Sequence, residues 1–153
     1  MIDVDPHMEH SPPDEHHERP TPIGIGLVRR GEYFLVRQRP SNTVYAGYWE
    51  FPGGKCEPGE DPSHATAREC FEETGLSVVV GALRRVTTHR YPHGLVELFF
   101  HECTPLHPGD EPAAGSGFQW VKAAELASLR FPEANEAVIE EIARPRSVET
   151  TRG

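Results

Sequence analysis

The stretch GGKCEPGEDPSHATARECFEETGL, residues 53–76, gathers acidic side chains between two glycine turns and constrains this chain more than any other segment. Pro62 suits the first turn of a helix, and Gly75 suits the left-handed residue that follows a helix end. We therefore expect a helix that opens at Pro62 and Ser63 and stops at Thr74 and Gly75. The six acidic residues of the stretch are Glu57, Glu60, Asp61, Glu69, Glu72 and Glu73.

Three carboxylates of this expected helix share one face, because Glu69, Glu72 and Glu73 point the same way at about 100° per residue. Like charges one turn apart destabilise a helix only slightly, so a solvated surface helix is one interpretation. The other is a metal site, since Mg²⁺ prefers carboxylate and carbonyl oxygens. Arg68 lies four residues before Glu72 and can orient one carboxylate through a charge-assisted bond. Glu60 sits in a turn that can fold back toward the same face.

The order of the fixed residues in this stretch resembles the Nudix box, GX5EX7REUXEEXGU with U aliphatic. If each residue type fills about one position in fifteen, a chance match at one register has a probability on the order of 10⁻⁸. The first U position carries Cys70, which packs as a small hydrophobe. The seven fixed positions that match are Gly54, Glu60, Arg68, Glu69, Glu72, Glu73 and Gly75.

The resemblance implies an α+β fold, a Nudix α/β/α sandwich with a mixed β-sheet. It also implies metal-dependent hydrolysis of nucleoside diphosphates linked to another moiety, with Mg²⁺ or Mn²⁺ as cofactor. Glu69 is the first choice for activating the attacking water, with Glu60 assisting and Arg68 orienting a carboxylate. Which glutamate is the general base stays open. The implied metal ligands are Glu69, Glu72, Glu73 and the backbone carbonyl of Gly53.

Three further segments resemble the MutT-type subgroup of nucleoside triphosphate pyrophosphohydrolases. YFLVRQRP supplies Arg39, fifteen residues before Gly54, which is the spacing of the subgroup's phosphate-contacting arginine. WEFPGGK, residues 49–55, resembles the subgroup's entry into the box. FPEANEAVI matches a segment that presents an asparagine to a purine, here Asn135, with Phe131 at the aromatic position. The resemblance implies hydrolysis of 8-oxo-dGTP to 8-oxo-dGMP and pyrophosphate.

Other interpretations of these residues remain open. Arg39 can be an ordinary strand-end arginine, and Asn135 can be a helix N-cap. A related enzyme can act on CTP-like or dCTP-like nucleotides or on nucleotide sugars. A non-catalytic Nudix-fold recognition domain is the least favoured, because such domains lose the box glutamates. The subgroup's additional loop acid has no match, since the spacing falls on Ala114 and neither Asp110 nor Glu111 can be assigned to it.

The formal net charge of −9 argues against a nucleic acid polymer as partner, which would need clustered lysine and arginine. No apolar run is long enough to predict a membrane span, and no secretory signal is recognisable. The three cysteines form no CxxC pair, which favours a reducing, cytoplasmic setting. A nucleoside triphosphate is the expected partner, and monomer or dimer stays open.

Composition divides the chain into three parts. Residues 1–20 are rich in proline, histidine and acid and are expected to be a disordered tail. Residues 21–145 are expected to form the Nudix domain, and residues 146–153 to be frayed. Within the domain we expect His89, His93 and His101 to be structural. The expected strands are 23–30, 33–39, 76–89, 95–104 and 118–121, the expected helices are 62–74, 123–129 and 133–143, and 41–61 is expected to be a loop.

Overall fold

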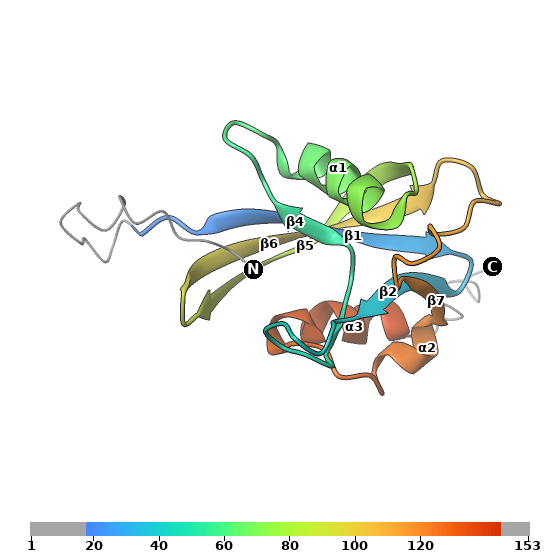
Figure 1. Cartoon of the computed structure of the whole chain (residues 1–153). Helices are drawn as coiled ribbons and strands as arrows, with labels where there is room; N and C mark the ends of the chain where they lie inside the picture. The colour runs from blue at the N-terminus through green and yellow to red at the C-terminus, as the bar shows by residue number, and fades with distance from the viewer. Residues whose placement is uncertain (1–17, 145–153) are drawn as a thin grey trace, which may run out of the picture.

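The computed structural model of this chain describes residues 18–144. A mixed sheet lies between helix α1 (Pro62–Thr74) on one side and helices α2 (Ala123–Leu126) and α3 (Glu136–Ala143) on the other, as Figure 1 shows. The predicted α+β sandwich with a mixed sheet is therefore confirmed. Residues 1–17 of the predicted tail and the predicted frayed segment 146–153 lie outside the described residues.

The sheet has the strand order β3-β2-β1-β6-β5, with β4 pairing β1 and β7 pairing β2. Strands β1 and β6 pair in parallel, and the other pairs are antiparallel. The central position of β1 therefore brings the early chain beside β4 and β6. The strands are β1 (Thr21–Arg30), β2 (Tyr33–Gln38), β3 (Trp49–Glu50), β4 (Gly53–Lys55), β5 (Val78–Tyr91), β6 (Gly94–Pro105) and β7 (Gln119–Lys122).

Strand β1 places α1 through the alternation of its side chains. Ile23 and Leu27 pack into the core on the α3 side, while the intervening glycines face α1. A Cβ added at Gly24 would lie 2.5 Å from both Pro62 O and Thr66 Oγ1. The helix that carries the acidic residues is thus in direct contact with the β1 backbone.

Two hydrophobic cores fill the sandwich, one on each face of the sheet. Burying one large apolar side chain contributes about 1.5–3 kcal/mol, so both faces hold the layers together. The α3-side core includes Leu27, Phe34, Phe100, Phe131, Val138 and Ile139. The α1-side core consists of Val28, Leu35, Cys70, Leu76, Cys103 and Phe118, with Cys70 fully buried at the first aliphatic box position.

Helix α1 matches its predicted bounds. Pro62 occupies its first turn, and Gly75 ends it with φ +82° while donating its N–H to Phe71 O at 2.9 Å. The prediction of a loop over 41–61 was wrong at β3 and β4, which are two and three residues long. Strands this short form because β1 and β2 offer backbone partners, a long-range effect that local turn signals do not reveal.

The other boundaries differ in detail. The strand expected at 76–89 starts at Val78 and continues to Tyr91, with register shifts between Val80 and Arg85. Helix α2 covers only the first part of the expected 123–129, and the segment Glu133–Asn135 is a 3₁₀ turn ahead of α3. Asn135 N–H donates to Pro132 O at 2.9 Å, the three-residue spacing of a 3₁₀ turn.

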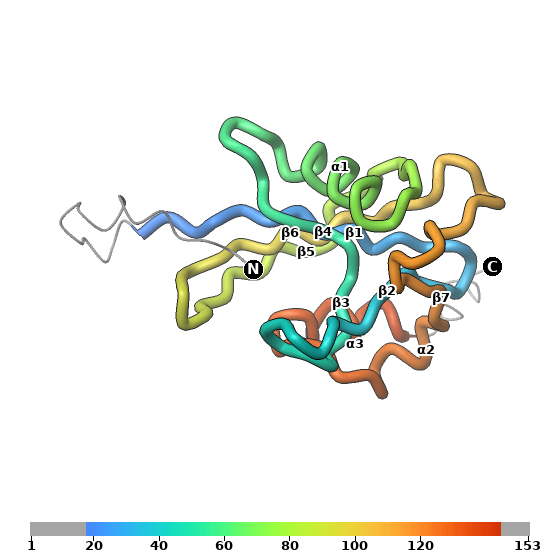
Figure 2. Tube along the Cα trace, viewed as in Figure 1, coloured from blue at the N-terminus to red at the C-terminus, as the bar shows by residue number. Residues whose placement is uncertain are grey.

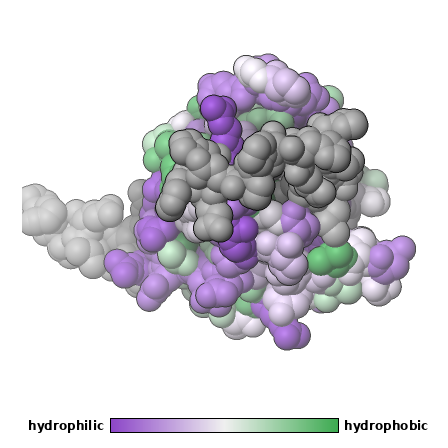
Figure 3. Space-filling view, turned by 90° about the vertical axis from the view of Figure 1, so that its left-hand side faces the viewer, coloured by the Kyte–Doolittle hydropathy of each residue, from purple (hydrophilic) through white to green (hydrophobic). Residues whose placement is uncertain are grey.

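The loop between β2 and β3 lies beside the segment that leads into α3, as the tube in Figure 2 shows. Trp49 N–H donates to Arg130 O at 2.8 Å, and the Arg130 guanidinium lies 4.5 Å from the centroid of the Tyr48 ring. On the face of Figure 3, outside its grey atoms, hydrophobic residues are scattered among hydrophilic ones. Along the described part of the chain, no helix is long and apolar enough to span a membrane.

Candidate active site

The acidic face of α1 lies against strand β4. A Cβ added at Gly54 would come within 2.4 Å of the Glu69 carboxyl carbon, so only a glycine permits this approach. Gly53 N–H donates to Glu73 Oε1 at 3.2 Å. The predicted metal ligands Gly53, Glu69 and Glu73 are therefore brought together. Glu72, the fourth, follows on the same helix with a side chain that is 56% exposed.

Arg68 holds the carboxylates of this face in a network. Its Nε and Nη2 donate to the two oxygens of Glu60 at 2.9 and 2.8 Å. Its Nη1 contacts Glu69 Oε2 at 3.1 Å and Glu72 Oε1 at 3.4 Å. The sequence left open which carboxylate Arg68 orients; the two-point bond goes to Glu60, and the contact with Glu72 is longer than those with Glu60 and Glu69.

Glu60 is an anion held in place from several sides. The side chain is only 8% exposed, and it also accepts the Glu57 N–H at 2.8 Å and contacts His64 Nδ1 at 2.7 Å. Arg68 is the main cause that holds the pKa of Glu60 well below its ordinary value, with the Glu57 N–H and His64 adding to it. A carboxylate of such low basicity is a weak proton acceptor. The geometry of Glu60 instead suits a role in holding the Arg68 guanidinium in place.

Glu73 has the opposite electrostatic character. Burial raises its pKa to about 7, against the lowering effects of the Gly53 N–H and the Arg37 guanidinium. A divalent cation beside this carboxyl group would favour its ionised form. Near neutral pH, the binding of a divalent cation would therefore displace a proton from the Glu73 carboxyl group.

The four predicted metal ligands offer carboxylate and carbonyl oxygens, which are the ligand atoms that a hard divalent cation prefers. Among residues 18–144, no three His, Cys, Asp or Glu side chains are already close enough to hold a metal ion. Arg68 Nη1 holds both Glu69 and Glu72 in this arrangement. Because Glu72 is largely exposed, its side chain can turn toward Glu69 without disturbing the core.

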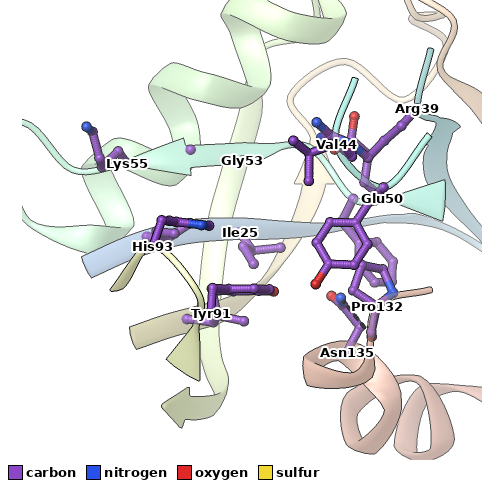
Figure 4. A pocket seen from close by; sticks show the side chains of 15 residues that line it. Ile25, Arg39, Val44, Glu50, Gly53, Lys55, Tyr91, His93, Pro132 and Asn135 are labelled. Carbon is purple, nitrogen blue, oxygen red and sulfur yellow. Dashed lines mark hydrogen bonds and ion pairs between the residues drawn. The ribbon is translucent and has the colours of Figure 1, made fainter. Parts of the chain in front are cut away.

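A pocket of about 250 Å³ opens next to these carboxylates, and Figure 4 shows the labelled side chains around it. Arg39 and Asn135, both predicted as substrate contacts, line this pocket from opposite ends of the domain sequence. The lining residues are Ile23, Ile25, Arg39, Val44, Tyr45, Glu50, Phe51, Gly53, Gly54, Lys55, Tyr91, His93, Leu98, Pro132 and Asn135.

Phe131, the third predicted substrate residue, lies behind the pocket wall. It is buried in the α3-side core, and its ring packs on Phe51 with centroids 5.1 Å apart. Phe51 itself lines the pocket. Phe131 is therefore placed to support the wall and does not form its surface.

Asn135 stands at the N-cap position of α3 but does not cap the helix with its side chain. Its Nδ2 donates to Pro132 O at 3.3 Å instead. The amide group therefore lies at the pocket, where its acceptor oxygen and a second N–H can meet a ligand.

Tyr45, Tyr91 and His93 line the pocket, although no functional role was predicted for them from the sequence. Tyr45 has φ +62°, the one positive value among the described non-glycine residues, and its ring lies 6.1 Å from that of Tyr91. The Tyr91 ring stacks on His93 at 5.4 Å. His93 was expected to be structural, yet it lines the pocket. The β5–β6 turn that presents Tyr91 and His93 is visible in sequence only as Pro92 and Gly94.

The remaining candidates lie elsewhere. Glu111 accepts from Trp120 Nε1 at 3.1 Å and pairs with Arg30 at 3.0 Å, so its carboxylate is engaged at the β1–β2 end of the sheet. Asp110 lies in the same loop, and its backbone carbonyl accepts from Arg30. His101 is buried against Thr66 of α1 at 3.4 Å, which fits the structural role expected of it.

Comparison with known proteins decides the family. A sequence model of the NUDIX domain matches residues 24–141. The chain belongs to the Nudix hydrolase family. The resemblance drawn from the box is thereby confirmed.

Individual relatives agree with this placement of the Nudix chain. The protein of Escherichia coli (strain K12) named 8-oxo-dGTP diphosphatase is 32% identical over 124 residues, which are 80% of this chain and 95% of that protein. The CTP pyrophosphohydrolase of the same organism is 44% identical over 59 residues, 39% of this chain and 44% of that protein. The solution structure of the E. coli ORF135 protein superposes with TM-score 0.68 and 25% identity, over 86% of this chain and 97% of that one.

Proposed function

We propose that this Nudix hydrolase is a metal-dependent nucleoside triphosphate pyrophosphohydrolase that prefers 8-oxo-dGTP. It converts 8-oxo-dGTP and water to 8-oxo-dGMP and pyrophosphate, which removes an oxidised precursor before DNA synthesis uses it. The similarity to a protein named 8-oxo-dGTP diphosphatase supports this choice of substrate.

The observation that carries the proposal is that the pocket and the acidic face of α1 share Gly53 and Gly54. Gly53 and Gly54 line the pocket together with Arg39 and Asn135. The same glycines touch Glu73 and Glu69. A nucleotide can therefore place its base by Asn135 and its phosphates by Arg39 and the α1 carboxylates at once.

The chemistry follows from this placement. A bound divalent cation, Mg²⁺ or Mn²⁺, neutralises phosphate charge and lowers the pKa of water. Glu69 accepts the proton of the attacking water while Arg68 keeps that carboxylate oriented. The water oxygen bonds to phosphorus, and the phosphorus–oxygen bond to the leaving pyrophosphate breaks. The proposed metal ligands are Glu69, Glu72, Glu73 and the Gly53 carbonyl oxygen.

The pocket supplies recognition. The Asn135 amide offers an acceptor and donors to a purine edge, and Phe51, supported by Phe131, offers an aromatic wall. Sites that read a base by hydrogen bonds reject analogues that lack the matching group.

The proposed setting is the cytoplasm, with no nucleic acid polymer as partner. Cys56, Cys70 and Cys103 are free thiols, as a reducing compartment would keep them. The net charge of −9 disfavours binding to a polyphosphate backbone without metal.

A second candidate is hydrolysis of CTP or dCTP, favoured by the similarity to a CTP pyrophosphohydrolase over 59 residues. The test is kcat/KM for 8-oxo-dGTP, dGTP, dCTP, CTP and a nucleotide sugar with Mg²⁺, with Glu72→Gln as the control. A preference for 8-oxo-dGTP in the wild type, together with a large loss of turnover in Glu72→Gln, supports the proposal. A preference for dCTP or CTP replaces it with the second candidate.

A further inference from the structure

A carboxylate shared by two arginines lies at the edge of the pocket. Arg39 Nη1 donates to Glu50 Oε1 at 2.7 Å. Arg37 Nε and Nη2 both donate to Glu50 Oε2, at 2.9 and 2.7 Å. The β2–β3 register places Arg37 directly opposite Glu50. All three side chains are between 21% and 26% exposed, so these bonds are largely shielded from water.

Resting on the function proposed above, we propose that Arg37 is a positioning residue for nucleotide binding. It anchors Glu50, and Glu50 in turn orients Arg39 toward the substrate phosphates. Arg39 and Glu50 both line the pocket and are labelled in Figure 4, whereas Arg37 does not line it. Arg37 therefore acts through its neighbours and without touching substrate.

The segment ahead of β7 fixes Arg37 from the other side. Its guanidinium lies 4.6 Å from the centroid of the Phe118 ring, and Nη1 donates to Ser116 O at 3.4 Å. Gly117 has φ +83°, and a Cβ there would lie 3.1 Å from Arg37 Cδ. An arginine held by a ring, a carbonyl and a carboxylate has little freedom to move. It gives Glu50 a rigid support.

The charges of the triad favour an anion at Arg39. One carboxylate between two guanidinium groups leaves a net positive charge, whereas Glu50 with Arg39 alone would be neutral. Arg39 uses Nε for Val44 O at 2.7 Å and Nη1 for Glu50. Within residues 18–144, its Nη2 makes no hydrogen bond and can donate to a phosphate oxygen. Arg37 thus supplies both orientation and charge.

The experiment compares KM and kcat for the nucleotide that the wild-type protein prefers. Arg37→Met removes the anchor, Arg37→Lys restores its charge without the two-point bond, and Arg39→Ala removes the phosphate contact. The double variant Arg37→Met with Arg39→Ala tests whether Arg37 acts through Arg39. Glu102→Gln is the matched control, because it breaks an arginine–glutamate pair of the same length, Arg84–Glu102 at 2.7 Å, outside the pocket.

We expect Arg37→Met to raise KM about tenfold with kcat nearly unchanged, since the lost interaction serves substrate and transition state alike. Arg37→Lys recovers part of the loss. Arg37→Met adds no further loss when Arg39 is already alanine, and Glu102→Gln behaves like the wild type. If Arg37→Met unfolds below the assay temperature, Arg37→Gln takes its place with the same expected rise in KM, since it also lacks the charge and the two-point bond.

Other results overturn the inference. An unchanged KM in a folded Arg37→Met protein removes the positioning role. Losses that multiply in the double variant mean that Arg37 does not act through Arg39. A wild-type protein that hydrolyses no nucleotide overturns the proposed function, and the inference falls with it. Normal wild-type turnover with unaffected Arg37 variants overturns the inference alone.

Discussion

The acidic face of α1 and the pocket beside it are built in opposite ways. The carboxylates of Glu60, Glu69, Glu72 and Glu73 come from one continuous stretch of chain, and Arg68 links the first three. The pocket draws its lining from β1, the β2–β3 loop, the β5–β6 turn and the segment before α3. One region is held by ion pairs within a helix and its entry, the other by packing between distant segments.

This difference suggests that the hydrolytic chemistry depends on the acidic face of α1, whereas substrate selectivity depends on the pocket. A site encoded in one helix keeps its geometry when loops change, so the same hydrolytic chemistry can serve many nucleotides. A pocket built from several loops can change its preference through single residues. We therefore expect substitutions on α1 to lower turnover of all substrates alike, and substitutions in the pocket to alter their ranking.

The largest effect is expected for Glu72→Gln. If Glu72 is a metal ligand as proposed, its loss removes several kcal/mol of transition-state stabilisation, which corresponds to a loss of kcat on the order of 10³. Steady-state kinetics with Mg²⁺ and Mn²⁺ titrations followed by electron paramagnetic resonance measure both turnover and metal affinity. Glu140→Gln, an exposed glutamate of α3, is the control. Full activity of Glu72→Gln would remove this residue from the metal site.

Next in size is Gly24→Ala, which tests how tightly α1 is docked. The added Cβ would lie 2.5 Å from Pro62 O, a backbone atom, so the helix must move away from β1. We expect a loss of about 3 kcal/mol in the free energy of unfolding. Chemical denaturation measures it, with Gly109→Ala as the control because no heavy atom lies within 4 Å of its added Cβ. Equal stability of both variants would contradict the close packing of α1.

Asn135→Ala is expected to alter preference by a smaller factor. Without the amide, the ratio of kcat/KM for 8-oxo-dGTP over dCTP should fall about tenfold, the effect of one lost hydrogen bond to a base edge. Substrate competition assays give this ratio directly. Asn42→Ala, outside the pocket, should leave it unchanged. An unaltered ratio in Asn135→Ala would exclude Asn135 from base selection.

The smallest effect concerns His101, which lies beneath α1. Burial lowers its pKa below the ordinary 6.5, although nearby Asp61 opposes this. The unfolded chain then binds a proton that the folded protein does not, so stability falls as pH drops through about 6.5. His101→Gln should show a smaller drop in Tm between about pH 7.5 and about pH 5.5 than the wild type. The exposed His107→Gln should keep the wild-type drop.

The sequence predicted the acidic face of α1 well and the pocket only in part. Local signals at Pro62 and Gly75 placed both ends of α1, and helical spacing brought the three glutamates to one face. Arg39 and Asn135 were found through resemblance, and both line the pocket. Tyr45, Tyr91 and His93 were not identified as pocket residues, since the position of each in the pocket depends on how separate loops pack together.

The errors have the same physical origin. Strands β3 and β4 are too short to show an alternating pattern and exist through pairing with β2 and β1. The pairing of Arg37 with Glu50 depends on that register, although two arginines two residues apart are a visible sign of a common strand face. The sequence left open which carboxylate Arg68 orients, because its two-point bond to Glu60 depends on how the turn before α1 folds.

One measurement tests the division between chemistry and selectivity most directly. It is the ratio of kcat/KM for 8-oxo-dGTP over dCTP, determined for the wild type, Glu72→Gln and Asn135→Ala with Mg²⁺. We predict that residual Glu72→Gln activity keeps the wild-type ratio at greatly reduced rates, while Asn135→Ala lowers the ratio at nearly normal rates for dCTP. A Glu72→Gln variant whose ratio changes as much as that of Asn135→Ala would contradict the account.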